Sequence, residues 1–295
     1  GRPALDAAIA AGAHYLDSTG EPPFIRAVFE EHGPRAAAAG AGLVTAFGAD
    51  WVPGNLAGAL AIAGGGATVT RVDVGYFIVP AGDGDGGVGA GDVSGGTRAS
   101  AAGAMLAPGF AFRDGRIVTE RGAAHIRDFP VAGASRPAFS LGASESFALP
   151  RLADRIRDVD VFLGAAGPAT RPLALFSAGS SLVTRIPGVR PGLEAVLSRV
   201  VTGSTGGPDA ATRARTGMYV VAIASDAAGT PQGDPIVLTG ANAYDFTGEI
   251  LAWGAITAAD GGLHGVGALG PVDGFGLRAL QDGVASAGVT RDVSG

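Results

Sequence analysis

Two stretches near the start of the chain decide its fold, "AHYLDSTGEPPF" (13–24) and "GLVTAFGADWVPGNLAG" (42–58). Each begins with a short apolar run that predicts a strand, at 13–16 and at 42–48, and continues through polar residues into a helix that opens at a proline. About two dozen residues separate the strands, which is enough for a helical crossover between parallel neighbours. We therefore predict a parallel sheet covered by helices.

The flanking residues extend this pattern. Residues 3–11 read as a helix that stops at Gly12, a common helix terminator. The run 24–40 places apolar residues at helical spacing, and Gly33-Pro34 is predicted to kink or divide that helix. Residues 49–66 follow as a turn and then a helix of small residues that ends in glycines.

After Gly66 the pattern changes to alternation. "ATVTRVDVGYFIV" (67–79) predicts a strand, and further short strands between turn residues are predicted at 115–120, 124–131, 136–143, 159–164, 217–225 and 234–242. Short strands of this kind indicate an antiparallel or mixed sheet. Helices are predicted at 172–186, 192–203, 242–259 and 275–288.

The predicted fold class is therefore α/β, with a partial Rossmann-like parallel sheet followed by an α+β domain that holds a mixed or antiparallel sheet. We assign residues 1–66 to the first domain, as the C-terminal part of a dinucleotide-binding unit, and residues 67–295 to the second. The last helices, at about 240–290, are expected to pack back on the first domain.

Composition narrows the choice of partners. The chain has 295 residues, of which 47% are hydrophobic, and a formal net charge of −6. An acidic chain without a basic cluster is a poor partner for nucleic acid or for anionic membranes. No apolar run approaches the roughly 18–20 residues that span a bilayer, and no signal peptide is visible. We expect a cytoplasmic protein that acts on small molecules.

Missing residue types exclude whole classes of chemistry. The chain has no cysteine and no lysine, which excludes thiol catalysis, thiolate metal sites and Schiff-base or P-loop lysine mechanisms. The four histidines are far apart in sequence and form no H-x-x-x-H pair, so no metal site is predicted. A Ser-His-Asp hydrolase remains an alternative, although the chain has no G-x-S-x-G elbow.

Residues 81–104 form a glycine-rich stretch that predicts a surface loop, either a lid or disorder. It contains a match to G-x-G-x-x-G at 84–89. More glycine follows instead of a helix, and Asp83, Asp85 and Asp92 would repel a phosphate. The match is therefore rejected as a phosphate cradle.

The acids that follow the two strands are better candidates for chemistry. Asp17 and Glu21 follow the first strand, and Asp50 follows the second. In open α/β sheets ligands bind outside the carboxyl ends of the strands, so the two loops are expected side by side at one ligand-binding edge. The alternative for each acid is structural, because capping of the following helix explains the same residue types.

The two loops resemble motifs of the saccharopine dehydrogenase-like oxidoreductases, in particular of the saccharopine reductase-type branch. That family has a strand ending in Tyr-x-Asp-x-x-Gly-Glu, which is matched by Tyr15, Asp17, Gly20 and Glu21. A second strand ends in Gly-x-Asp-x-x-Pro, which is matched by Gly48, Asp50 and Pro53. The resemblance continues at 93–100, 145–152, 240–255 and 265–280, and the group includes trans-acting enoyl reductases of lipid biosynthesis.

The resemblance implies an NAD(P)-dependent oxidoreductase that transfers hydride between nicotinamide and a C=N or C=C bond of a small metabolite or lipid-type substrate. It implies catalytic roles for Asp50, the first choice for proton handling, and Asp17. The implied cofactor-binding residues are Tyr15, Asp17, Gly20, Glu21, Gly48 and Pro53. The implied substrate-binding residues are Ser94, Gly95, Gly96, Thr97, Arg98 and Tyr76. Packing is the alternative for Tyr15 and Tyr76, and an ordinary solvated loop is the alternative for residues 94–98.

The family's glycine-rich dinucleotide loop has no counterpart in this chain and is expected upstream of Gly1. The chain alone is therefore expected to bind NADP or NAD weakly or not at all. The resemblance also implies that the second domain shapes the substrate pocket and carries a homodimer contact. The alternative is a non-catalytic descendant or accessory subunit that uses the same fold to bind a partner.

Overall fold

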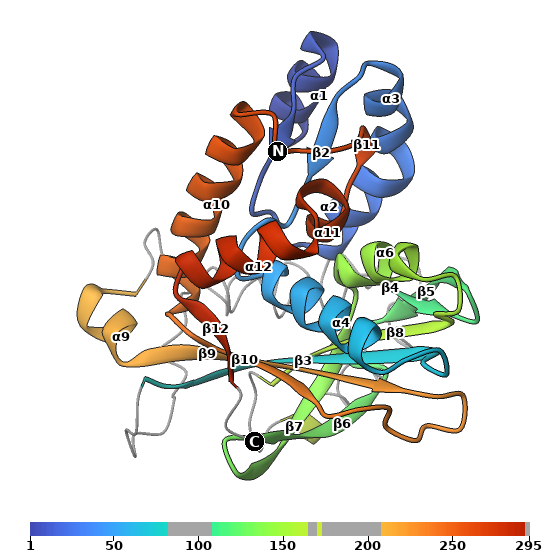
Figure 1. Ribbon diagram of the computed structural model, residues 1–295, viewed down its shortest axis with the longest axis vertical. Coiled ribbons are helices and arrows are strands. Elements are labelled where there is room, and N and C mark those ends of the chain that lie inside the picture. Colours follow the sequence, from blue (N-terminus) through green and yellow to red (C-terminus); the bar gives the residue numbers. More distant parts are fainter. Residues whose placement is uncertain (82–107, 165–169, 173–207, 293–295) are drawn as a thin grey trace, which may run out of the picture.

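The computed structural model describes residues 1–81, 108–164, 170–172 and 208–292. These residues form a small parallel sheet of three strands, in the order β1-β2-β11, and a mixed, mostly antiparallel sheet of nine strands (Figure 1). The predicted fold class is confirmed, since the chain is α/β with a parallel sheet followed by a mixed one. The glycine-rich stretch and the helices predicted at 172–186 and 192–203 lie almost wholly outside the described residues.

The small sheet begins as the sequence predicts. Helix α1 (Arg2–Ala11) ends at Gly12, whose φ of 63° lies in the left-handed region that glycine adopts readily. Strands β1 (Tyr15–Leu16) and β2 (Gly42–Val44) pair in parallel, with Tyr15 opposite Leu43. β2 is shorter than predicted, because the chain turns at Ala46, whose φ is 57°.

The crossover between β1 and β2 is one helical run in three parts. They are α2 (Pro22–Ala27), a π-helical turn η1 (Val28–His32) and α3 (Gly33–Ala38). The Gly33 N–H bonds to the Val28 carbonyl, five residues back, and Pro34 has no N–H to donate. The regular hydrogen-bond ladder is therefore interrupted where the sequence predicts a division.

The end of the chain completes the small sheet. Strand β11 (Gly267–Ala268) pairs in parallel with β2 and lies beyond the whole of the large sheet in sequence. It is preceded by α10 (Ala243–Ala259) and followed by α11 (Pro271–Phe275) and α12 (Leu277–Ser286) (Figure 1). In α10, the Thr247 hydroxyl accepts a hydrogen bond of 3.0 Å from the Ala49 amide.

The large sheet has the order β12-β10-β9-β3-β8-β4-β5, with the hairpin β6–β7 joined to β8. Among the strands that the structure describes in this sheet, β3 and β8 are the one parallel pair. Its strands are β3 (Arg71–Pro80), β4 (Pro108–Arg113), β5 (Arg116–Arg121), β6 (Ile126–Val131), β7 (Ala134–Leu141), β8 (Asp158–Leu163), β9 (Thr216–Ser225), β10 (Ile236–Gly240) and β12 (Val289–Asp292). β4, β11 and β12 are not predicted from the sequence. The remaining short elements are α6 (Glu145–Ala148), η3 (Leu149–Leu152) and α9 (Ala210–Ala214).

Helix α4 (Val52–Gly64) joins the two sheets. It follows β2 in the chain, yet it packs on the large sheet against β3 and β9 (Figure 1). Most of its residues are buried, because Ala and Gly let it approach its neighbours closely on several sides. One continuous apolar core consequently extends from Leu5 in α1 to Val289 in β12, across residue 66.

Both faces of β3 are covered. Val72, Val74 and Tyr76 face the main core under α4, and the opposite face carries Phe77 in a second cluster with Phe129 and Phe162. In the described ranges no helix combines the length and the apolar character that a membrane crossing requires.

Candidate functional site

The two strand-end loops lie side by side, as the parallel sheet predicts, and Asp17 joins them. Its Oδ1 accepts hydrogen bonds from the Thr19 amide (3.0 Å), the Thr45 hydroxyl (2.8 Å) and the Ala46 amide (3.3 Å). The Phe47 amide also donates to the Asp17 carbonyl at 2.7 Å. Asp17 therefore holds the loop after β1 against the loop after β2.

Helix capping does not explain this loop. The N-cap of α2 is Glu21, and no side chain caps that helix. Asp17 instead uses one oxygen for three donors, while its other oxygen, Oδ2, is buried and has no hydrogen-bond partner among the described residues. The neighbouring Tyr15 is half-buried, and desolvation together with the Asp17 carboxylate raises its pKa.

Gly20 and Gly48 serve close packing within the protein. A Cβ on Gly20 would lie 3.1 Å from the Asp50 Cβ, and the Gly20 carbonyl accepts a hydrogen bond of 3.2 Å from the Trp51 indole. A Cβ on Gly48 would lie 3.0 Å from Cγ2 of Thr247 in α10. Pro53 is buried in the first turn of α4. The cofactor-binding roles that the resemblance implies for these residues stay predictions.

Asp50 is the titratable group at this edge. Asp50 is an exposed residue, but Gly20 of the neighbouring loop lies against its side chain, and its carboxyl group is desolvated. Desolvation, and second the nearby Glu21 carboxylate, raise the pKa of Asp50 from 3.8 to about 6. A carboxyl group with this pKa exchanges a proton readily near neutral pH.

A buried polar cluster lies directly behind Asp50. The Tyr76 hydroxyl, on β3, accepts a hydrogen bond of 2.8 Å from the Gly54 amide. Its single proton faces two acceptors, Glu145 Oε1 at 2.6 Å and the Trp51 carbonyl at 3.0 Å. The Trp51 ring also packs edge-on against the Tyr76 ring, with centroids 5.0 Å apart. Tyr76 is therefore an interior residue whose hydroxyl contacts protein groups.

The environment of this cluster favours neutral side chains. Desolvation raises the pKa of Glu145 from 4.5 to about 8, against the opposing effect of its hydrogen bond from Tyr76. Desolvation and the Glu145 carboxyl also raise the pKa of Tyr76 well above its usual value. Asp50 contributes to both shifts through its charge.

Sequence reasoning missed Glu145, Ser144 and Asn55 as members of this cluster. The Asn55 amide nitrogen donates to the Trp51 carbonyl and to the Ser144 hydroxyl, each at 2.9 Å. One signal was available, since Asn55 is a polar residue inside an otherwise small and apolar helix. Glu145 follows a strand end as the other acids do, but its contact with Tyr76 spans 69 positions.

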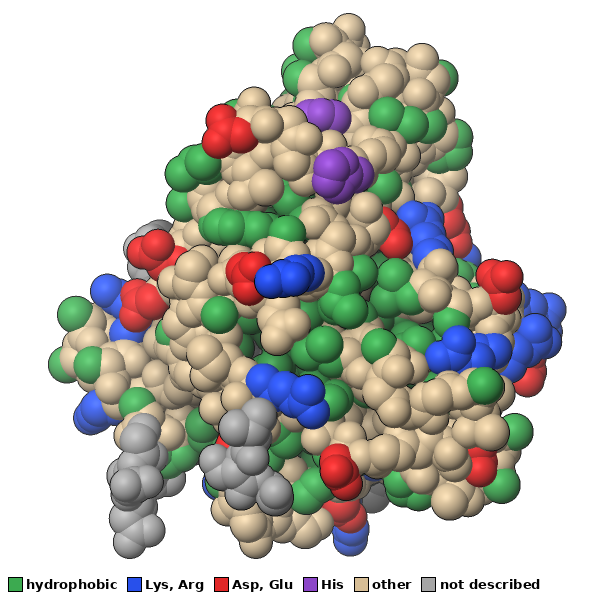
Figure 2. Space-filling view, viewed as in Figure 1, with side chains coloured by type: hydrophobic (Ala, Val, Ile, Leu, Met, Phe, Trp, Pro, Cys, Tyr) green, Lys and Arg blue, Asp and Glu red, His purple; other side chains and the backbone are tan. Residues whose placement is uncertain are grey.

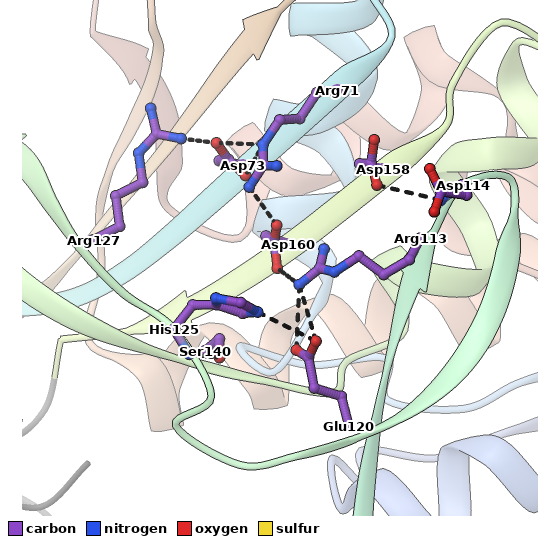
Figure 3. Close-up of polar contacts among 10 residues, drawn as sticks. All are labelled: Arg71, Asp73, Arg113, Asp114, Glu120, His125, Arg127, Ser140, Asp158 and Asp160. Carbon is purple, nitrogen blue, oxygen red and sulfur yellow. Dashed lines mark hydrogen bonds and ion pairs between the residues drawn. The ribbon is translucent and has the colours of Figure 1, made fainter. Parts of the chain in front are cut away.

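A second polar cluster covers the opposite face of the large sheet (Figure 3). Arg71 bonds to the buried carboxylates of Asp73 and Asp160, Arg127 pairs with Asp73, and Arg113 pairs with Asp160. Each buried carboxylate therefore has two arginine partners. This pairing is typical of a structural ion network.

The same cluster contains a serine, a histidine and an acid, but they do not form a hydrolase triad. The Ser140 hydroxyl accepts from the backbone amide of His125 at 3.0 Å, and the His125 ring faces Glu120 at 3.2 Å (Figure 3). A triad requires the hydroxyl to bond to the ring. Across the described ranges, no three His, Asp or Glu side chains gather as metal ligands would.

The substrate-binding residues implied for the glycine-rich stretch, Ser94, Gly95, Gly96, Thr97 and Arg98, lie outside the described residues. Figure 2 shows acidic and basic side chains interspersed over one face of the molecule, with apolar side chains between them. No protein-family model matches this sequence, and a search of curated proteins finds no significant match.

Proposed function

We propose that this chain is part of an NAD(P)-dependent oxidoreductase in which Asp50 exchanges a proton with the substrate. The observation that carries the proposal is Asp50 itself, an acid with a pKa raised to about 6, open to solvent at the carboxyl ends of two parallel strands. That edge is where open α/β sheets bind ligands. The resemblance of both loops to saccharopine dehydrogenase-like enzymes supplies the reaction class.

The chemistry assigned to this chain is the proton transfer. The bound nicotinamide would supply or take the hydride. In the reducing direction the protonated Asp50 carboxyl would give its proton to one atom of a C=N or C=C bond, and the other atom would receive the hydride. Asp50 would then take up a proton from solvent, because the residue is exposed.

The residues at this edge do not fit the pyrophosphate of a dinucleotide. A phosphate site at a helix N-terminus needs open N–H groups and no nearby negative charge. Here Glu21 is the N-cap residue of α2, and Asp50 precedes α4. The Gly54 amide in the first turn of α4 already donates to Tyr76. We therefore assign no phosphate contact to these residues, and Asp17 acts as the residue that joins the loops.

The test uses the protein as its gene encodes it. Calorimetry with NADPH and with NADH is expected to detect binding of one of them. Oxidation of that cofactor, followed with imine and enoyl substrates, is expected to fall about 10²-fold or more in Asp50→Asn, the size of a general-acid contribution. The matched control is Asp234→Asn, because Asp234 is exposed on the loop before β10.

The outcomes distinguish an oxidoreductase from a non-catalytic subunit. Binding of the cofactor with loss of turnover in Asp50→Asn alone supports the oxidoreductase. Binding of neither NADPH nor NADH contradicts it and favours a non-catalytic subunit that binds a partner. Equal turnover in Asp50→Asn and Asp234→Asn would show that Asp50 takes no part in the reaction.

A further inference from the structure

Glu145 is a buried acid without a counter-charge. It is the first residue of α6 and is fully buried. Within the described part of the chain, no Arg or His forms an ion pair with it. An ionised carboxylate without such a partner is costly inside a protein, and the group takes up a proton instead.

The groups around Glu145 include more hydrogen-bond acceptors than donors. Glu145 Oε2 and Asn55 Oδ1 are buried acceptors without a hydrogen bond of standard geometry among the described residues. The Ser144 hydroxyl and the Glu145 amide also act on the carboxylate, but desolvation outweighs them in the pKa of Glu145. The Asn55 amide nitrogen is already engaged by Trp51 and Ser144. A proton on Glu145 would turn one of its oxygens into a donor and lessen this shortage.

We propose that Glu145 is protonated in the folded protein at neutral pH and, through Tyr76, is a positioning residue for Asp50. Its carboxyl oxygen Oε1 orients the Tyr76 hydroxyl, which contacts the Trp51 carbonyl and the Gly54 amide, the backbone directly after Asp50. The raised pKa of Glu145, about 8, agrees with this state. The catalytic meaning of the positioning rests on the proposed function, whereas the protonation does not.

Among the described residues, Asp50 is the one charged group whose charge shifts the pKa of Glu145. Asp50 raises its pKa, and Tyr76, Asn55 and Ser144 are neutral neighbours. Charged side chains on the elements packed against α6 are engaged elsewhere: Arg151 of η3 with Asp273 of α11, and Arg113 of β4 with Asp160 of β8. A cation that would hold Glu145 ionised is therefore not among these groups.

The experiment is an NMR titration of carboxyl carbons between pH 4 and 10 in the wild-type protein and in Glu145→Gln. The wild-type Glu145 signal is expected to titrate at about 8 and the Asp50 signal at about 6. Glutamine copies the protonated acid, with one acceptor and one donor group. The Asp50 midpoint is therefore expected to stay unchanged in Glu145→Gln, as in the control Glu31→Gln at an exposed position of η1.

Two further variants test whether Glu145 positions the backbone next to Asp50. Glu145→Ala and Tyr76→Phe are expected to shift the Gly54 amide and Trp51 indole signals, whereas Glu145→Gln keeps them near their wild-type positions. Rescue by glutamine and not by alanine distinguishes positioning from simple space filling. The titration of Glu145 uses the wild-type protein, so its protonation can be tested even if a variant fails to fold.

A Glu145 signal that titrates below pH 6 overturns the proposal. So does a fall of about one unit in the Asp50 midpoint of Glu145→Gln, because it would show that a charged Glu145 had repelled Asp50. An equal shift of the Gly54 amide signal in Glu145→Gln and Glu145→Ala would show that Glu145 has no positioning role. None of these measurements uses NADPH, so failure here is distinct from failure to bind a cofactor.

Discussion

Asp73 on β3 and Asp160 on β8 lie directly opposite each other in the parallel register, and both are buried. Two like charges in this arrangement repel each other. The Arg71 guanidinium bonds to both, at 3.1 Å to Asp73 and 2.6 Å to Asp160, and so joins the only parallel pair of strands in the described large sheet (Figure 3).

Arg71→Ala is expected to destabilise the protein by about 2–4 kcal/mol, because it leaves two buried carboxylates with one arginine each. Urea unfolding measures this loss. Arg116→Ala is the control, since Arg116 is exposed on β5, and it is expected to change the free energy of unfolding by less than about 0.5 kcal/mol. Equal stability of the two variants would contradict a structural role for the network.

Gly54→Ala is expected to destabilise the protein by about 1–3 kcal/mol through overpacking. A Cβ at this position would overlap the Tyr76 hydroxyl and Glu145 Oε1, and both groups are buried. Gly64→Ala at the end of the same helix meets no atom within 4 Å and is expected to be neutral or slightly stabilising. Thermal unfolding of the two variants compares them, and a neutral Gly54→Ala would mean that the buried cluster is loosely packed.

Asp17→Ala and Asp17→Asn separate structure from catalysis. Alanine removes the acceptor of three hydrogen bonds and is expected to cost about 1–3 kcal/mol. Asparagine keeps one acceptor oxygen and is expected to retain most of the stability. If Asp17 only joins the loops, Asp17→Asn also keeps turnover. A stable Asp17→Asn protein without turnover would restore the catalytic role that the resemblance implies.

Asp50 gives the stability of the protein a defined pH dependence. The ordinary pKa of its carboxyl group, which applies in the unfolded chain, is 3.8, and in the folded protein the pKa is about 6. Between these values the folded protein holds a proton that the unfolded chain releases, so the free energy of unfolding falls as pH rises from about 4 to 6 and this contribution is constant above that range. Asp50→Asn is expected to remove this decline. Denaturant unfolding at a series of pH values measures it, and parallel curves for wild type and Asp50→Asn would refute the shift.

The same reasoning extends to Glu145 over a higher range. Its folded-state pKa of about 8 lies above the ordinary 4.5, so its contribution to stability declines as pH rises between these values and is lost above them. In Glu145→Gln this slope is expected to be absent, and the variant is expected to gain stability relative to wild type as pH rises. Unfolding curves at pH 5, 7 and 9 test the gain. A loss that grows with pH would contradict it.

The sequence by itself determined the local elements and the edge at which the acids gather. Proline at the start of helices, glycine at their ends and the alternation in β3 act over a few residues, so they can be read without the fold. The parallel pairing of β1 and β2 follows from the crossover between them, and it places the loops of Asp17 and Asp50 side by side.

Only the tertiary structure decided what those residues touch. β11 has two residues and no pattern of its own, and it forms because β2 offers an unpaired edge after more than two hundred intervening residues. Glu145 and Tyr76 meet because α4 and α6 both pack against the face of the large sheet that carries Tyr76. Burial and hydrogen-bond partners depend on contacts between distant parts of the chain, and these contacts decide that Asp17 joins two loops while Asp50 remains free to titrate.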